Sequence, residues 1–381
     1  MKHTVGSHQL FRIGFVIDSQ YPNLLGAFTR ECGFLNLFTG FPSNSPVGFM
    51  RFGWIADAVN RVERDLHYEL FRPFRRYDAV VFLKSMGKDC ITLAQNLKKQ
   101  GVKIVFDANV DYLTPAEGTF YYEGMAPTEA QRLDMLDMLN VADAVIADSE
   151  LIAKHCQAIH PKVNWISDSV KMDLVPRPRG GVNRDRLTVL WSGTSCKVFE
   201  LLLIAPILLA HAERLRLVLV TDEWSGVERC FEPYQQQVKD LLAGLEHEII
   251  RFRSIEQLLS VYTDGNLFVA PRFLDNTYNM GHTEWKITLP MACGRFVLAS
   301  PQPSYLTVFA RSNGKGLRIC SNLNDWSREM NAVLGGTINL EEEGKYGRRT
   351  VETYYATEKI ARVHAVLMRQ LLHMNGASHP A

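Results

Sequence analysis

The sequence lacks several patterns that define common classes of enzyme. No G-x-G-x-x-G follows the first strand-like run, and none opens the second half, which disfavours a dinucleotide-dependent dehydrogenase. No G-x-S-x-G occurs, which disfavours a serine hydrolase of the α/β type. The seven cysteines are scattered and contain no C-x-x-C, and cysteine and histidine never have zinc-site spacing. We therefore expect reduced, buried thiols in a cytosolic protein, and no metal site.

The chain also lacks an excess of one charge and a long apolar run. Its 42 Lys and Arg against 41 Asp and Glu give a formal net charge of +1, so no global positive field exists to hold nucleic acid. No stretch reaches the roughly 18–20 apolar residues of a membrane span. The N-terminus does not have the layout of a signal peptide. We expect a cytoplasmic protein without a nucleic-acid partner, and its oligomeric state stays open.

What the sequence does contain is an alternation of strand-like and helix-like segments over 381 residues. That length suits two domains, and the alternation predicts parallel α/β architecture. A stretch rich in proline, glycine and arginine, 173–186, is the best linker candidate. We predict an N-terminal domain over 1–175, a second domain over 183–350, and a helix over 352–375 that closes the chain.

Both predicted domains are Rossmann-like. The first contains the strand candidates 11–18, 77–85, 102–109, 142–149 and 162–170, and the second contains 187–193, 215–222, 247–252, 266–271 and 296–301. Ligands of open α/β sheets bind at the carboxyl ends of the strands, so a cleft between two such domains is the expected site.

Residues 187–306 resemble the donor domain of GT-B glycosyltransferases, in particular the family-four-like enzymes (glycosyl transferases group 1). The resemblance rests on the order of WSGTSCK, the strand Asp264–Pro271, a helical lysine followed by MACG, FVLAS and PQPSY. The N-terminal half is similar through SPVGFMRFGWIADAVN and its later strands. The resemblance implies a GT-B fold, with two Rossmann-like domains facing across a cleft and a C-terminal helix returning to the N-terminal domain. It implies transfer of a sugar from a nucleotide-sugar.

The donor-side candidates combine the resemblance with the residue chemistry. Gly193 allows the backbone to approach an anion, and a helix N-terminus offers N–H donors to a diphosphate. The resemblance makes Lys286 the phosphate-binding lysine, catalytic through the charge of the leaving group. Lys197 is a second phosphate cation or a solvated side chain. The full donor-binding set is Ser192, Gly193, Thr194, Lys197, Phe252, Arg253, His282, Thr283, Glu284 and Lys286.

One departure from the family pattern concerns the ribose of the donor. The family's ribose-binding glutamate falls at Leu289, and the earlier acid of its Glu-x7-Glu pair falls at Gly281. Glu284 and His282 lie close in the sequence and are the candidate substitutes. The alternatives are a divergent subclass that holds its nucleotide differently, or an inactive relative.

The acceptor-side candidates follow strands of the N-terminal half. Asp107 and Asp111 are candidates for a general base toward an acceptor hydroxyl. The alternative is that Asp107 hydrogen-bonds to the backbone of its loop and that Asp111 forms a turn. Arg51 either binds an anionic acceptor or is exposed. The remaining acceptor-side candidates are Ser45, Lys84 and Asn109.

We expect a metal-independent glycosyltransferase without a cofactor. The chain contains no Asp-x-Asp, the pair that holds the metal in GT-A transferases, and Lys286 favours a cationic side chain in that role. The acceptor could be a glycan, a lipid-linked glycan, a small molecule or a protein. The alternatives are a non-catalytic GT-B relative and a GT-B-like sugar-nucleotide epimerase or hydrolase. Arg72, Arg75 and Arg76, with Phe71 and Phe74, could contact the inner face of a membrane or form a solvated loop, with the aromatic side chains packed inward.

Overall fold

The computed structural model describes residues 10–17, 48–177 and 186–373. They form two compact units, each described here by itself. The first unit contains the described residues up to Thr114, Thr128–Ser169 and the helix that begins at Thr357, and the second contains Pro115–Pro127 and Val170–Ala356. The chain therefore passes between the units on both sides of the short segment Pro115–Pro127. Of the predicted linker, 178–185 lies outside the described residues.

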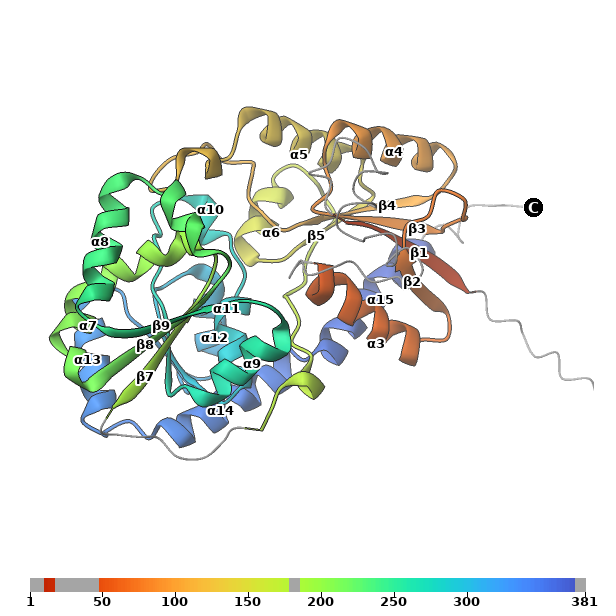
Figure 1. Cartoon of the computed structure of the whole chain (residues 1–381). Coiled ribbons are helices and arrows are strands. Elements are labelled where there is room, and N and C mark those ends of the chain that lie inside the picture. Colours follow the sequence, from red (N-terminus) through yellow and green to blue (C-terminus); the bar gives the residue numbers. More distant parts are fainter. Residues whose placement is uncertain (1–9, 18–47, 178–185, 374–381) are drawn as a thin grey trace, which may run out of the picture. The chain divides into compact units, whose positions relative to one another are not determined.

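The first unit is a parallel sheet in the order β2-β1-β3-β4-β5-β6. Its central strand AVVFL is buried throughout because helices cover both faces of the sheet. One face packs against α3 and α15, and the other against α4, α5 and α6 (Figure 1). The elements are β1 Phe11–Ile17, a π-helical turn Gly48–Gly53, α3 Trp54–Val62, β2 Leu66–Leu70, β3 Ala79–Leu83, α4 Lys88–Lys99, β4 Lys103–Ala108, α5 Glu129–Val141, β5 Ala144–Ala147, α6 Glu150–Gln157, β6 Val163–Trp165 and α15 Thr357–His373.

The second unit is also a parallel sheet, in the order β12-β11-β10-β7-β8-β9. In chain order this is the Rossmann arrangement, in which the strand order reverses between β7 and β10. The strands are β7 Leu187–Ser192, β8 Leu215–Thr221, β9 Glu246–Arg251, β10 Leu267–Ala270, β11 Phe296–Ala299 and β12 Leu317–Ile319. The α-helices are α7 Ala205–Ala210, α8 Glu232–Ala243, α9 Ile255–Asp264, α10 Thr277–Met280, α11 Trp285–Ala292, α12 Pro303–Arg311, α13 Leu323–Leu334 and α14 Leu340–Tyr354. Short 3-10 helices cover Glu123–Met125, Met172–Leu174, Ser195–Ile204, Ala212–Arg214 and Trp224–Arg229.

The end of the chain differs in one respect from the predicted single helix. Two helices, α14 and α15, are separated at Tyr355 and Ala356. The carbonyl of Tyr355 accepts a hydrogen bond from the amide of Val170, which takes it out of a continuous helical ladder. The break coincides with the return of the chain to the first unit, where α15 packs beside α3.

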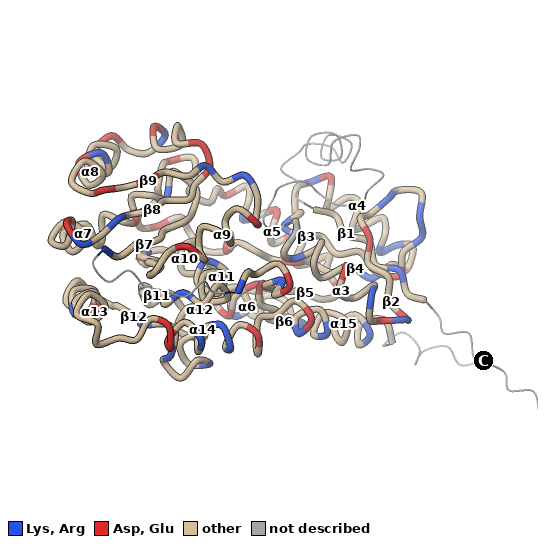
Figure 2. Tube along the Cα trace, turned by 60° about the horizontal axis from the view of Figure 1, so that its bottom comes forward, with Lys and Arg blue, Asp and Glu red and all other residues tan. Residues whose placement is uncertain are grey.

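Charged residues of both signs are interspersed along both units (Figure 2). This agrees with the balanced composition of the chain, 42 basic against 41 acidic residues. No helix in the described part of the chain is long and apolar enough to cross a membrane.

Candidate functional site

The candidate site of the second unit lies where β7 and β10 end, at the point where the strand order reverses. Ser192 is the last residue of β7, and the turn Gly193-Thr194 follows it. Arg272 comes two residues after β10. Because ligands of open α/β sheets bind at this switch point, the side chains around it are the first to consider.

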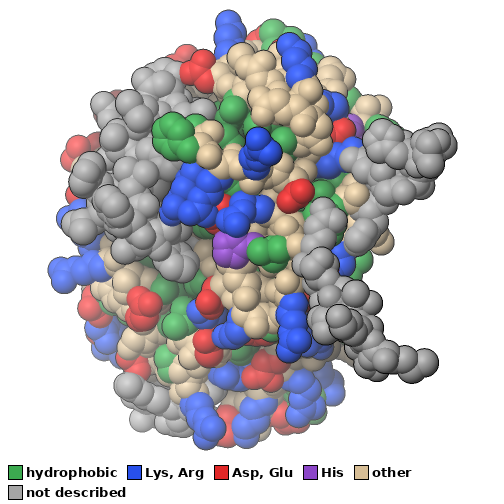
Figure 3. Space-filling model, turned by 90° about the vertical axis from the view of Figure 1, so that its right-hand side faces the viewer, with side chains coloured by type: hydrophobic (Ala, Val, Ile, Leu, Met, Phe, Trp, Pro, Cys, Tyr) green, Lys and Arg blue, Asp and Glu red, His purple; other side chains and the backbone are tan. Residues whose placement is uncertain are grey.

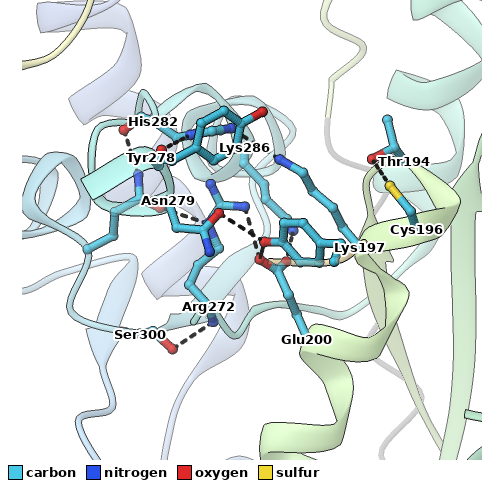
Figure 4. A network of polar contacts seen from close by, with 12 residues as sticks. Thr194, Cys196, Lys197, Glu200, Arg272, Tyr278, Asn279, His282, Lys286 and Ser300 are labelled. Atoms are coloured by element: carbon cyan, nitrogen blue, oxygen red, sulfur yellow. Dashed lines mark hydrogen bonds and ion pairs between the residues drawn. The ribbon is translucent and has the colours of Figure 1, made fainter. Parts of the chain in front are cut away.

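A fully buried carboxylate, Glu200, stands at the centre of this site (Figure 4). It belongs to the 3-10 helix Ser195–Ile204. Arg272 donates to it through Nη1 at 3.1 Å, and Lys286 through Nζ at 3.2 Å. The hydroxyl of Tyr121 donates to the same carboxylate. A buried charge is costly unless it is paired, and these three donors supply the pairing.

A third positive side chain, Lys197, lies beside this group. Its Nζ is 3.1 Å from Nε2 of His282. Nδ1 of His282 is 2.7 Å from the carbonyl of Tyr278, and a carbonyl can only accept, so Nδ1 carries the hydrogen and Nε2 accepts from Lys197. Lys197, Arg272 and Lys286, which we call the cation cluster, thus gather around Glu200 (Figure 4).

Both lysines of this cluster have lowered pKa values, and burial is the largest cause. Burial lowers the pKa of Lys197 to about 7, and repulsion from Arg272 adds to the effect. Burial likewise lowers the pKa of Lys286 to about 8, although Glu200 opposes the shift. Burial acts to raise the pKa of Glu200, but the three cations outweigh it and lower that pKa. An added anion would stabilise the charged form of both lysines and raise their pKa values, so the site is suited to bind one.

The turn after β7 differs from the predicted cradle of N–H donors. The amide of Gly193 donates to the carbonyl of Val220, and the amide of Ser195 donates to Asp222. A Cβ added at Gly193 would lie 3.7 Å from Nζ of Lys286 and 3.0 Å from the ring of Trp191. Gly193 therefore leaves space beside Lys286 because it has no side chain. The amides of Gly193 and Ser195 are already hydrogen-bonded within the protein.

The other donor-side candidates are placed by the elements next to them. Thr283 and buried Glu284 immediately precede α11, which carries Lys286. Phe252 is half-buried and Arg253 exposed, in the loop between β9 and α9. Leu289, at the position of the family's ribose-binding acid, is buried.

In the first unit, Arg51 is not exposed. Its side chain is 2% exposed and forms ion pairs with Asp107 at 2.9 Å and Asp168 at 2.8 Å. Its Nη1 also donates to the carbonyl of Ile166. Asp107 is therefore committed to neutralising a buried guanidinium, and it would have to break that pair to accept a proton.

The remaining acceptor-side candidates have mixed positions. Asn109 donates to Asp148 at 3.3 Å. Asp111 is buried and accepts from the amide of Leu113 and the hydroxyl of Thr114, as expected for a turn-forming residue. Lys84 follows β3 with a φ of 54°. Ser45 lies outside the described residues.

The basic cluster of the first unit is an exposed loop between β2 and β3. Phe74 is 98% exposed, whereas Phe71 packs into the core, so the two aromatic side chains behave differently. Arg75 pairs with Glu69, which also accepts from Arg12. The face of the molecule that carries β1 and β2 shows Lys and Arg side chains gathered beside a histidine (Figure 3).

Three residues of the site were not among the sequence candidates: Glu200, Arg272 and Tyr121. Two of them had a usable signal. Glu200 is the one charge in the apolar run VFELLLIAP, and Arg272 directly follows the strand NLFVAP. Tyr121 had none, because it comes from a loop of the other half of the sequence.

Among solved structures, the chain is similar to GT-B glycosyltransferases. The HepE protein of Anabaena, solved with UDP and glucose, matches with a TM-score of 0.63 and 13% identity over 94% of this chain and 100% of its own. Sucrose-phosphate synthase from Thermosynechococcus elongatus matches with a TM-score of 0.61 and 18% identity over 78% and 74%. AviGT4, a glycosyltransferase involved in avilamycin A biosynthesis, matches with a TM-score of 0.58 and 12% identity over 96% and 99%. No family model matches the chain, and no curated protein does.

These likenesses and the two parallel sheets confirm the predicted fold class. The chain has the GT-B fold, with two Rossmann-like domains. At such low sequence identities the likeness reaches the fold and no further, so the activity has to be argued from the site.

Proposed function

We propose that this protein is a glycosyltransferase that moves a sugar from a nucleoside diphosphate sugar to a hydroxyl group, without a metal ion. The cation cluster at the switch point of the second unit carries the proposal. A departing nucleoside diphosphate accumulates negative charge, and preorganised cations stabilise it. The lowered pKa values of Lys197 and Lys286 indicate that the site favours such an anion.

The members of the cluster have different roles in this proposal. Lys286, whose side chain is 15% exposed, and half-buried Lys197 reach the diphosphate. Arg272 is held by Glu200 and by Gln302 at 2.9 Å, so it fixes Glu200 instead of contacting the substrate. Glu200 in turn orients Lys286, which also lies 4.7 Å from the ring centre of Trp191.

The comparisons support a nucleotide-sugar as the donor. HepE was solved with UDP and with UDP-glucose, and AviGT4 is a glycosyltransferase. We propose a nucleotide-sugar donor for this chain, and a glycan, a lipid-linked glycan or a small molecule as its acceptor. Phe252 and Arg253 are our candidates for the contact with the base, and Thr283 and Glu284 for the contact with the sugar.

A second candidate function is a non-catalytic relative that binds a nucleotide or glycan. The observation in its favour is Leu289, a buried apolar side chain at the position of the family's ribose-binding acid. The two functions differ in one measurable respect, because only a transferase cleaves its donor.

The test is donor cleavage by the full chain. UDP-glucose, UDP-N-acetylglucosamine, GDP-mannose, ADP-glucose and dTDP-glucose are each incubated with wild type, and released diphosphate is measured with and without glycan acceptors. We expect release from one donor. Binding of UDP, GDP, ADP or dTDP without release from any donor would favour the non-catalytic relative, and absence of both would overturn the proposal.

The affinity for the diphosphate should fall as the pH rises. The pKa values of Lys197 and Lys286 are about 7 and about 8 in the free protein. A bound anion raises both pKa values, so binding takes up protons and weakens once the free lysines lose theirs. We expect the dissociation constant of UDP to rise between pH 7 and pH 9, by at most about tenfold per pH unit for each lysine. Calorimetric titrations across this range check it, and a flat profile would contradict protonated lysines as the ligands.

A further inference from the structure

The segment Pro115–Pro127 connects two parts of the first unit, yet it packs with the second. It leaves after Thr114, beyond β4, and returns at Thr128, the cap of α5. Its Tyr121 is fully buried in the core of the second unit, with its ring 4.9 Å from that of Phe199. Burial of a large aromatic side chain holds this segment in place.

Tyr121 contacts the candidate site directly. Its hydroxyl donates to Glu200 and lies 3.3 Å from Oδ1 of Asn279. Nζ of Lys197 lies 5.2 Å from the centre of its ring. Tyr121 therefore contacts both the carboxylate and one of the lysines of the cation cluster.

The rest of the segment holds the loop that precedes α10. Thr119 donates to Asp275 through its amide at 2.9 Å and its hydroxyl at 2.6 Å. Nδ2 of Asn276 returns a hydrogen bond to the carbonyl of Thr119 at 2.8 Å. Gly118 has a φ of +86°, and a Cβ there would lie 2.5 Å from the carbonyl oxygen of Asp275. Only glycine fits this close approach.

The start of the segment is fixed in the first unit by a contact between a buried carboxylate, Asp111, and a half-buried histidine, His155. Asp111 accepts from the hydroxyl of Thr114, the last residue before the segment, and from Nδ1 of His155 at 2.9 Å. His155 belongs to α6 of the first unit. At the other end, Thr128 and Gln131 form a capping box that fixes the start of α5.

We propose that Pro115–Pro127 is a coupling strap, through which the Asp111–His155 pair of the first unit positions the anion site of the second unit. Tyr121 is a positioning residue in this scheme, because it acts through Glu200 and Lys197. The coupling to a ligand rests on the proposed function, whereas the mechanical link does not. Linkage makes the effect reciprocal: a ligand at the cation cluster must also stabilise the strap and the Asp111–His155 pair at its start.

The first experiment needs no ligand. Amide hydrogen exchange of the peptides covering 115–127 and 270–286 is compared between wild type, Asp111→Ala and the milder His155→Gln. His67→Gln, on β2 at the edge of the first sheet, is the control. We expect Asp111→Ala and His155→Gln both to accelerate exchange in 270–286, although neither residue lies in the second unit. Exchange there that matches the control, in variants whose first unit remains folded, would overturn the strap.

The second experiment adds UDP to wild type and Tyr121→Phe, with Tyr122→Phe as the control. Loss of the hydrogen bond to a charged carboxylate should weaken UDP binding roughly tenfold. UDP should slow exchange at 109–114 in wild type and fail to do so in Tyr121→Phe. If wild type binds UDP without any change at 109–114, the coupling is wrong and the proposed function stands. If it binds no nucleotide, the proposed function fails, and the ligand-free experiment alone decides on the strap.

Discussion

Replacement of Lys286 by alanine is expected to lower kcat/KM for the nucleotide-sugar by two to three orders of magnitude, about the loss seen when one preorganised transition-state donor is removed. Lys286 lies at the switch point, where we place the leaving diphosphate, and burial lowers its pKa to about 8 although its Nζ is 3.2 Å from Glu200. Initial rates of donor cleavage, measured over a range of donor concentrations, give this quantity.

The Lys286→Ala variant should remain folded, which keeps the result interpretable. Glu200 retains Arg272 and Tyr121 as donors, so no buried carboxylate is left without a partner. Lys345→Ala is the matched control, because that lysine is exposed and its ion pair with Glu341 lies at the surface. Equal rates for the two variants would show that Lys286 takes no part in the reaction.

The second large effect is expected on stability. Glu200→Gln keeps the size of the side chain but removes its charge, and it leaves buried Arg272 without its anion. Breaking one side of a buried ion pair costs about 3–5 kcal/mol. We therefore expect the free energy of unfolding of the second unit to fall by about that amount, measured by urea titration.

A ligand offers an internal check on this prediction. A bound diphosphate brings negative charge to the same cations, so saturating UDP should restore part of the stability that Glu200→Gln loses. Glu341→Gln, an exposed position, should change the free energy of unfolding by no more than about 0.5 kcal/mol. A Glu200 variant as stable as this control would show that the carboxylate does not hold the cluster together.

The α/β class and most strands could be predicted because buried parallel strands leave continuous apolar runs. NLFVAP and FVLASP are such runs, and both are strands of the second sheet. The strand Leu66–Leu70 was missed, since LHYEL at the sheet edge alternates in burial and resembles the end of the preceding helix. The spacing of apolar residues also could not predict the type of helix. Residues 195–204 form a 3-10 helix, although their apolar residues suit an α-helix equally well.

The candidate site could be predicted only where function leaves a local trace. Lys286 and Lys197 stand in a recognisable order along the chain, and both lie in the cation cluster. Arg51 and Asp107 have the same residue types as binding groups, but their pairing depends on segments 56 residues apart. Tyr121 and Glu200 are 79 positions apart and come from different halves, so only the folded chain brings them together.

The central claim is that the cation cluster binds a nucleoside diphosphate, and a thermal-shift panel tests it most directly. UDP, GDP, ADP, CDP and dTDP are added to wild type, Lys286→Ala and Lys345→Ala. A ligand at about 100 times its dissociation constant adds roughly 2.7 kcal/mol of stability. We predict a rise in Tm with one of these nucleotides for wild type and Lys345→Ala, and its loss in Lys286→Ala. A shift that survives in Lys286→Ala, or no shift with any nucleotide in folded wild type, would contradict the assignment of this site.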